Sequence, residues 1–231
     1  MNLNLFYQAE PFPMLSIETI AVILVGYLLG SIPFAVIVAK RAGVDIFSVG
    51  SGNPGATNVL REVGKQAGYC VFVLDFLKGW AATAWFHLPL FDFSGDPTLG
   101  LWGLPAAVVG HSFPVFSRFR GGKGVAATMG GLLGVMPMAL LIGLVLWLGL
   151  FFSTRYVALA SIGFGLSLPV STTAMLGMEG SHWGEVVLAL LVMGLITWRH
   201  RSNITRLREG TESRFDRGKS RKSPNETLLR Y

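Results

Sequence analysis

Six long apolar segments constrain the fold of this chain more than any other feature. Several of them reach the roughly 20 residues that an α-helix needs to cross the hydrocarbon core of a bilayer. Only 14% of the 231 residues are charged, and charge inside a bilayer is costly. We therefore expect an all-α, polytopic integral membrane protein whose apolar segments span about 15–39, 67–91, 99–113, 125–153, 156–176 and 184–198.

The positive charges predict how these segments are oriented. All 19 lysines and arginines except Lys78 fall in five places, and the other connections carry none. Cytoplasmic loops of membrane proteins are enriched in Lys and Arg. We therefore expect the N-terminus outside, the C-terminus in the cytoplasm, and the basic places on the cytoplasmic side, at 40–65, 118–123, 155, 199–208 and 214–230.

The 125–153 segment must be divided if this orientation holds. Lys123 and Arg155 flank it on the same predicted side, so the chain crosses an even number of times between them. We expect a hinge near Pro137 and about seven crossings in all, some of them short. A helix over 125–136 would rise about 18 Å, against a hydrocarbon core of about 30 Å, so neighbouring helices must shelter it. The alternative is one kinked helix that leaves Arg155 outside.

Composition also excludes several classes of protein. The net charge of +6 is distributed over segment ends and forms no single basic face, which argues against nucleic-acid binding. Cys70 is the only cysteine, so there is no disulfide framework and no cysteine metal site. Because acidic residues are few and scattered, we expect no metal and no cofactor. We expect an external segment at 1–14, a helical membrane domain at 15–208 and a polar cytoplasmic tail at 209–231.

A glycine-rich stretch, SVGSGNPGATNVLR at 48–61, follows the first apolar segment. Its glycines permit positive φ, so that successive backbone N–H groups can point into one concavity and bind an anion. Arg61 adds a planar guanidinium that matches phosphate. A flexible turn is the other interpretation. The anion-binding hypothesis uses the backbone of Gly50, Gly52 and Gly55 and the side chains of Ser51, Asn53, Thr57 and Asn58.

The second unusual stretch is GHSFPVFSRFRGGKG at 110–124. Gly121, Gly122 and Gly124 surround Lys123 and lead into a predicted helix, an arrangement that offers backbone donors, a helix N-terminus and a cation. It is not a Walker loop, since the spacing and the following Ser or Thr are missing. The alternative is a basic turn with aromatic residues at the lipid boundary, namely Phe113, Phe116 and Phe119.

The third stretch, RHRSNITRL at 199–207, follows the last apolar segment. If the helix continues, His200 and Asn203 share one face, and Arg199 and Arg206 lie on a neighbouring one. Arginines at a cytoplasmic helix end usually anchor the helix, which explains the arginines but not the histidine and asparagine. Because all three stretches lie on one predicted side, we infer a site there for a ligand that carries more than one phosphate.

These stretches together resemble the bacterial membrane acyl-phosphate:glycerol-3-phosphate acyltransferase family. The similarity is ordered along the chain and extends to LLGSIPFA and LDFLKG. It implies that a fatty acyl group passes from acyl phosphate to the 1-hydroxyl of glycerol 3-phosphate, giving lysophosphatidate and inorganic phosphate for phospholipid synthesis. It also implies a monomer in the bacterial inner membrane, with a membrane acyltransferase domain whose active site faces the cytoplasm. The matching segments are 28–35, 50–61, 74–79, 110–124 and 199–212.

The resemblance also implies roles for individual residues. Ser161 is assigned through RYVALASI at 155–162, where Ala158 replaces the serine of the family. The acyl phosphate would contact Gly50, Ser51, Gly52, Asn53, Gly121 and Gly122; glycerol 3-phosphate would contact Arg61, Lys123, Ser161, His200 and Asn203; and Ser51, Arg61, Lys123, His200 and Asn203 would be catalytic.

The chemistry needs no covalent nucleophile, and none is recognisable in the sequence. Acyl phosphate is already an activated anhydride, so orientation of the hydroxyl and stabilisation of developing charge can suffice. His200 is either a general base or a phosphate ligand, and we favour the ligand. The phosphate of the substrate is a further candidate to accept the proton.

Other polar residues have simpler explanations. His87 and Asp92 fit the HxxxxD pattern of a different acyltransferase superfamily, but they lie on the predicted outer side. Asp75 and Lys78 are expected to form an ion pair inside a membrane segment. For His111, packing at a helix end is favoured over a ligand role.

A transporter for small phosphorylated anions is the main alternative function. Such a protein also needs basic groups that face a cavity between broken helices. A transporter should hold its site near the bilayer midplane, whereas the glycines and cations here cluster at one predicted membrane face. A scaffold is the third hypothesis, but it would not need the glycine-rich loops.

Overall fold

The computed structural model describes residues 16–88, 99–176 and 183–215. Regular structure in this part is helical, without a strand, as expected for the all-α class. Three helical stretches in it are long and apolar enough to cross a membrane: Ile17–Arg41, Pro137–Thr154 and Val157–Met175. The elements are α1 (Ile17–Gly30), α2 (Phe34–Arg41), α3 (Ala56–Glu62), α4 (Lys65–Ala84), η2 (Trp85–His87), α5 (Gly100–Ser112), η3 (Val115–Ser117), α6 (Val125–Val135), α7 (Pro137–Thr154), α8 (Val157–Met175), α9 (Trp183–Arg199) and α10 (Arg201–Arg208).

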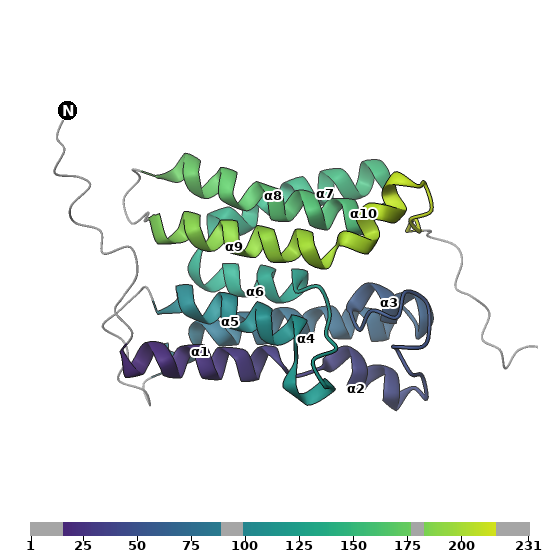
Figure 1. Ribbon diagram of the computed structural model, residues 1–231, viewed down its shortest axis with the longest axis horizontal. Coiled ribbons are helices and arrows are strands. Elements are labelled where there is room, and N and C mark those ends of the chain that lie inside the picture. Colours follow the sequence, from purple (N-terminus) through teal and green to yellow (C-terminus); the bar gives the residue numbers. More distant parts are fainter. Residues whose placement is uncertain (1–15, 89–98, 177–182, 216–231) are drawn as a thin grey trace, which may run out of the picture.

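The long helices lie side by side in two groups (Figure 1). In one group α1, α4, α5 and α6 pack together, and in the other α8 packs between α7 and α9. Contacts of α5 with α9 and of α6 with α7 join the groups. A buried apolar cluster fills the junction and includes Leu104, Leu132, Phe164 and Ile196. This packing fixes the loops at one end of the bundle relative to one another.

Helix α6 is short and packs closely against α4. A Cβ atom built on Gly79 would lie 2.0 Å from the carbonyl oxygen of Ala127, and one on Gly130 would lie 1.8 Å from that of Phe76. Only glycine permits such an approach of two helix backbones. Residues 127–132 of α6 are buried as a result, so neighbouring helices shelter the short helix as expected.

The expected hinge near Pro137 is confirmed. Helix α6 ends at Val135 and α7 begins at Pro137, the first helical position, where the missing N–H of proline costs nothing. Val125 and Val157 both border the same cavity, so the chain leaves one end of the bundle along α6 and returns to it along α7 (Figure 1).

Two helical stretches are interrupted by a short break. The first is broken between Gly30 and Phe34, where Pro33 lacks a backbone donor. At this break the Ile32 carbonyl accepts from the Lys78 ammonium at 2.8 Å as well as from the Phe34 N–H at 3.1 Å. The second is broken at His200, whose φ and ψ of −94° and 6° separate α9 from α10. The last helix therefore does not continue unbroken through His200, which answers the condition that the sequence left open.

Candidate active site

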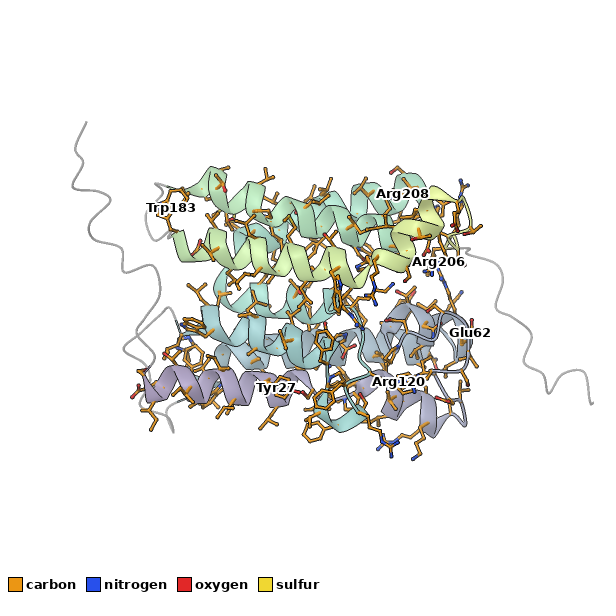
Figure 2. All side chains as sticks on the ribbon, viewed as in Figure 1. Tyr27, Glu62, Arg120, Trp183, Arg206 and Arg208 are labelled. Atoms are coloured by element: carbon orange, nitrogen blue, oxygen red, sulfur yellow. The ribbon has the colours of Figure 1, made fainter. Side chains whose placement is uncertain are left out.

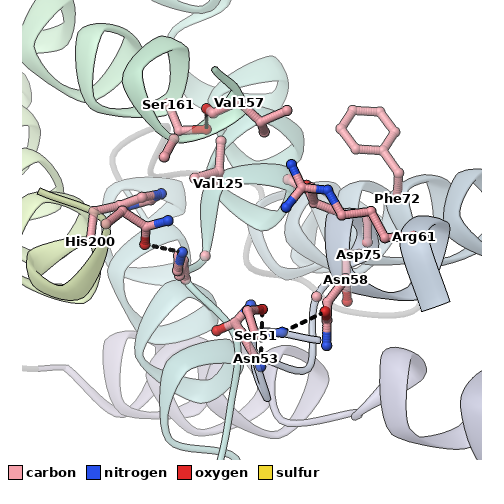
Figure 3. A pocket seen from close by; sticks show the side chains of 18 of the residues that line it. Ser51, Asn53, Asn58, Arg61, Phe72, Asp75, Val125, Val157, Ser161 and His200 are labelled. Carbon is pink, nitrogen blue, oxygen red and sulfur yellow. Dashed lines mark hydrogen bonds between the residues drawn. The ribbon is translucent and has the colours of Figure 1, made fainter. Parts of the chain in front are cut away.

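A cavity of about 490 Å³ opens where the loop after α2, the loop before α6 and helix α10 meet; we call it the main cavity (Figure 3). Three chain segments that are distant in the sequence therefore converge on it. Nine side chains that the sequence singled out as candidate ligands border it: Ser51, Asn53, Thr57, Asn58, Arg61, Lys123, Ser161, His200 and Asn203.

The glycine-rich loop is held open by positive φ angles and by one buried side chain. Gly50 and Gly52 have φ angles of 56° and 65°, as glycine permits. The Asn58 side-chain oxygen accepts from the Ser51 N–H at 3.1 Å, and its amide group donates to the carbonyls of Ile46 and Val49. Asn58 thus braces the loop, and the expectation that it offers a donor to the ligand is corrected.

Gly55 also departs from its expected conformation. Its φ of −146° is extended backbone that any residue adopts. Gly50, Ser51 and Asn53 border the main cavity, whereas Gly52 borders a neighbouring cavity. The loop therefore presents its serine and asparagine to the ligand space.

Lys123 reaches the main cavity from the loop before α6, where Gly124 takes a φ of 83° and begins the helix. Its ammonium donates a hydrogen bond to the side-chain oxygen of Asn203. Burial, followed by the charges of nearby arginines such as Arg206, lowers the pKa of Lys123 to about 8, although Glu212 opposes the shift. Lys123 is therefore a cation that loses its proton only slightly above neutral pH.

The glycines before Lys123 hold the loop and do not border the main cavity. The Gly122 N–H donates to the carbonyl of His111 at 3.1 Å. The Arg199 guanidinium donates to the carbonyls of Gly121 at 2.6 Å and Gly122 at 3.0 Å. The Gly122 N–H is thus already bonded to His111, which corrects its expected contact with acyl phosphate. Gly121 borders two smaller cavities beside the main one but not the main cavity itself.

His200 is buried, and its ring is oriented by the preceding helix. The Nδ1 atom lies 2.8 Å from the carbonyl oxygen of Ile196. Because a carbonyl only accepts hydrogen bonds, we assign the ring proton to Nδ1, which leaves a lone pair on Nε2. Burial and then the charge of Lys123 lower the pKa of His200 to about 4. The imidazole is therefore neutral at pH 7 and can accept a hydrogen bond.

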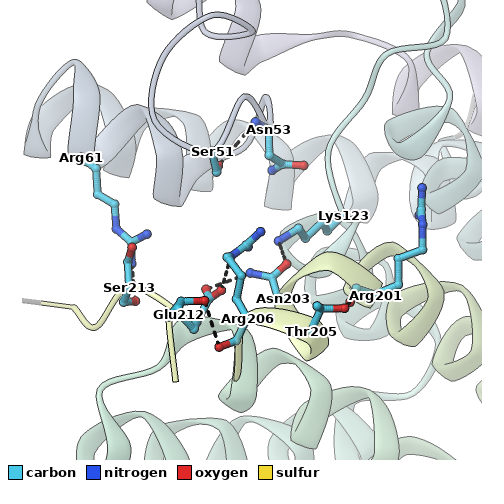
Figure 4. A network of polar contacts seen from close by, with 11 residues as sticks. Ser51, Asn53, Arg61, Lys123, Arg201, Asn203, Thr205, Arg206, Glu212 and Ser213 are labelled. Atoms are coloured by element: carbon cyan, nitrogen blue, oxygen red, sulfur yellow. Dashed lines mark hydrogen bonds and ion pairs between the residues drawn. The ribbon is translucent and has the colours of Figure 1, made fainter. Parts of the chain in front are cut away.

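An acidic residue that sequence reasoning missed joins the site. The Glu212 carboxylate accepts from the Asn203 amide at 2.8 Å and from Arg206 Nε at 2.7 Å (Figure 4). In the same segment, the Ser213 carbonyl accepts from Arg61 at 3.1 Å. Glu212 and Ser213 both border the main cavity. Glu212 is the last residue of RHRSNITRLREGTE, one of the segments that carry the family resemblance, and that resemblance could have identified it.

These contacts also revise the expected polar tail. The Phe215 N–H donates to the carbonyl of Arg155 at 2.7 Å, and the Phe215 ring packs on Phe151. Residues 211–215 therefore lie against the helices beside the main cavity and are not a fully solvated tail. Residues 216–231 lie outside the described residues.

One wall of the main cavity is apolar. Its side chains come from α4, α6, α7 and α8, as Figure 3 shows in part. At the edge of this wall, the Trp147 ring nitrogen donates to Ser161 Oγ at 3.4 Å, and the Ser161 hydroxyl donates to the Val157 carbonyl at 2.8 Å. The cavity thus joins a cationic end to a wall made of Phe72, Val125, Met129, Trp147 and Val157.

The expected ion pair inside α4 is present. Lys78 Nζ lies 2.8 Å from Asp75 Oδ1, and both side chains are almost fully buried. His111 is buried at the end of α5, with Nδ1 3.5 Å from the same carboxylate, and it also borders the main cavity. His111 is therefore packed at the end of α5 and also lies beside the space available to a ligand. His87 ends η2, and Asp92 lies outside the described residues.

Across residues 16–88, 99–176 and 183–215, no group of three or more His, Cys, Asp and Glu side chains is arranged to hold a metal ion. What the arrangement offers chemically is a set of cations, amides and hydroxyls, with a few carboxylates such as Glu212 among them, facing an apolar wall.

Known proteins resemble this chain over most of its length. The chain is 43% identical to the glycerol-3-phosphate acyltransferase of Aquifex aeolicus (strain VF5) over 199 residues, which cover 86% of this chain and 100% of the relative. It is also 43% identical to the enzyme of Bacillus cytotoxicus (strain DSM 22905 / CIP 110041 / 391-98 / NVH 391-98) over 205 residues, which cover 88% of this chain and 98% of that one.

Solved structures are similar as well. The integral membrane glycerol 3-phosphate acyltransferase PlsY (YgiH), in its glycerol 3-phosphate form, matches with a TM-score of 0.76 and 38% identity, covering 93% of this chain and 100% of that one. Its lysophosphatidic acid form matches with a TM-score of 0.74 and 40% identity, covering 86% of this chain and 96% of that one.

The sequence profile of the family described as glycerol-3-phosphate acyltransferase matches residues 20–210. This match includes the glycine-rich loop, the loop that carries Lys123, and the segment with His200 and Asn203. The chain belongs to the glycerol-3-phosphate acyltransferase family.

Proposed function

We propose that this membrane acyltransferase uses acyl phosphate as its donor and acylates the 1-hydroxyl of glycerol 3-phosphate, releasing lysophosphatidate and inorganic phosphate. The observation that carries the proposal is the two-sided main cavity. Its cationic end suits two phosphate groups, and its apolar wall suits a fatty acyl chain. The glycerol 3-phosphate and lysophosphatidic acid forms of the similar PlsY structures support the acceptor and the product.

The two reactants are assigned to different parts of the cavity. Glycerol 3-phosphate binds through Arg61, Lys123 and Asn203, whose side chains carry donors and two positive charges. Ser51 and Asn53, on the loop opposite, bind the acyl phosphate headgroup, while its chain lies along the apolar wall. The reacting carbonyl is thereby brought beside the acceptor hydroxyl, which supplies much of the rate enhancement.

The reaction forms a bond between the acceptor oxygen and the acyl carbon and breaks the bond from that carbon to the phosphate oxygen. His200 Nε2 accepts a hydrogen bond from the attacking hydroxyl and orients it. This assignment replaces the ligand role that was favoured for His200, because a neutral ring with Nδ1 already used has no donor for phosphate. With a pKa of about 4, His200 is a weak base. The proton therefore passes to the departing inorganic phosphate, which gains a negative charge when the bond to the acyl carbon breaks and is the stronger base.

The same end of the bundle faces the cytoplasm in our proposal. The loop after α2, the loop before α6, the α7–α8 connection and α10 gather there (Figure 1), and the labelled Arg120 and Arg206 lie there while Trp183 lies at the opposite end (Figure 2). The positive-inside tendency makes this end cytoplasmic. Seven crossings follow, by α1 with α2, then α4, α5, α6, α7, α8 and α9, in a monomer of the bacterial inner membrane with its N-terminus outside.

Purified protein in zwitterionic lipid vesicles provides the direct test. Acyl phosphate should release inorganic phosphate only when glycerol 3-phosphate is present, and mass spectrometry should identify lysophosphatidate in equal amount. Phosphate release that ignores glycerol 3-phosphate would defeat the proposal. Transport of intact glycerol 3-phosphate across the vesicle membrane, with no lipid product, would instead favour a transporter for small phosphorylated anions.

A further inference from the structure

A second cavity of about 380 Å³ adjoins the main one. Four residues border both cavities: Ser51, Asn53, Lys123 and Arg206. A phosphate held by these residues therefore lies at the boundary between two spaces. The second space is bordered in addition by Arg120 and Arg201, which do not reach the main cavity.

The second cavity is strongly cationic. No aspartate or glutamate borders it, whereas five basic side chains do: Arg120, Lys123, Arg199, Arg201 and Arg206. Within the described part of the chain, no ion pair joins Arg120, Arg199 or Arg201 to a carboxylate. Their charges therefore act on whatever enters from water, and a cleft lined by one sign of charge concentrates counter-ions.

The guanidinium groups are held in place without carboxylates. Arg120 lies over the Phe47 ring, 4.1 Å from its centre. Arg201 lies over the Trp198 ring at 4.6 Å and donates to the Trp198 carbonyl at 3.3 Å. A guanidinium stacked on a ring still presents N–H groups at its edge, and these groups match phosphate oxygens. Both arginines are thus partly ordered before an anion binds.

The apolar side chains of the main cavity do not continue into the second one. Neither Trp147 nor Met129 borders it. Its apolar lining consists of Phe47, Pro54 and Phe119, and Phe47 is already covered by Arg120. The second cavity is therefore suited to a small, water-soluble phosphate compound and unsuited to a fatty acyl chain.

We propose that the second cavity is an anion vestibule, a binding site for phosphate mono- or dianions that connects water with the main cavity. It receives the phosphate of incoming glycerol 3-phosphate, departing inorganic phosphate, or both, and Arg120 and Arg201 are its distinguishing residues. The inference rests on the proposed function, because these anions are the soluble reactant and product of that reaction.

Steady-state kinetics of the double variant Arg120→Gln/Arg201→Gln test the proposal. In zwitterionic vesicles at low salt, the KM for glycerol 3-phosphate and the inhibition constant of added inorganic phosphate should rise on the order of tenfold, with kcat nearly unchanged. Both effects should shrink as salt is raised, because exposed charges are screened. A change in the KM alone identifies a site for the incoming reactant, and a change in the inhibition constant alone identifies a site for the departing phosphate.

Arg118→Gln is the matched control, since Arg118 belongs to the same loop as Arg120 but borders neither cavity. It should leave both constants unchanged. The vestibule is refuted if the double variant keeps wild-type constants at low salt, or if Arg118→Gln changes them as much. Either result is distinguishable from failure of the proposed function, in which the wild-type protein would form no lysophosphatidate.

Discussion

Lys123 and Asn203 are 80 positions apart in the sequence, yet the Lys123 ammonium donates a hydrogen bond to the Asn203 side-chain oxygen at the edge of the main cavity. This contact joins the loop before α6 to helix α10. The same asparagine is held from its other side by Glu212. A ligand phosphate that reaches Lys123 therefore meets a cation whose position is already fixed.

The pH dependence of activity should follow Lys123. Its pKa of about 8 means that the free protein carries the charge below pH 8 and loses it above. If the charge binds glycerol 3-phosphate, kcat/KM for this substrate should be high below pH 8 and fall about tenfold per pH unit well above it. Lys123→Arg keeps its charge at these pH values and should lose this alkaline decrease. An unchanged decrease in that variant would assign it to another group.

Arg61→Ala should raise the KM for glycerol 3-phosphate on the order of tenfold or more, since a hydrogen bond to a charged group contributes about 1.5–3 kcal/mol. The KM for acyl phosphate should change less. Arg41→Ala offers a comparison, because Arg41 is an exposed residue that borders neither cavity. Equal effects on both substrates would contradict the assignment of Arg61 to the acceptor.

Gly52→Val should impair the use of acyl phosphate. Gly52 has a φ of 65°, and an added Cβ would lie 3.0 Å from the Phe47 carbonyl oxygen, so the loop that carries Ser51 must shift. We expect a higher KM for acyl phosphate with a smaller effect on glycerol 3-phosphate. Gly194→Val is a suitable control, because its Cβ position meets no atom within 4 Å. Wild-type kinetics in Gly52→Val would refute the role of this loop.

The buried pair of Asp75 and Lys78 should matter for stability. Asp75→Asn leaves a buried ammonium without its carboxylate, which costs about 3–5 kcal/mol. Thermal unfolding in detergent should therefore occur at a clearly lower temperature, whereas exposed Glu209→Gln should barely change it. Asp75→Leu/Lys78→Leu removes both charges and should recover part of the loss, but not all of it, because the Ile32 carbonyl loses the Lys78 donor. Full recovery would show that this last contact is unimportant.

Cysteine labelling tests the proposed orientation. With Cys70 replaced by serine, a cysteine at Thr154, the last residue of α7, should react with an impermeant maleimide only from the cytoplasmic side. Labelling from the outer side would leave the α7–α8 connection outside and would refute the two crossings proposed for α6 and α7.

Much of this protein was predictable because the relevant forces act locally along the chain. Apolar runs long enough for a bilayer predicted the helices, and Pro137 predicted the division between α6 and α7. The glycines that permit positive φ at positions 50 and 52 were also recognisable. The family resemblance identified which residues to examine, since its motifs are contiguous strings.

Only the tertiary structure determined which of those residues face the ligand and which hold the loops in place. Asn58 and Gly122 looked like ligand donors, but the loop carbonyls of Ile46 and Val49 and the carbonyl of His111 take up their donors. Glu212 became part of the site because the chain reverses after α10 at Gly210, where φ is 68° and the Glu212 N–H donates to the Arg206 carbonyl. Hydropathy and backbone preference are properties of neighbours in sequence, whereas the free donors and acceptors of a side chain depend on which distant segment folds against it.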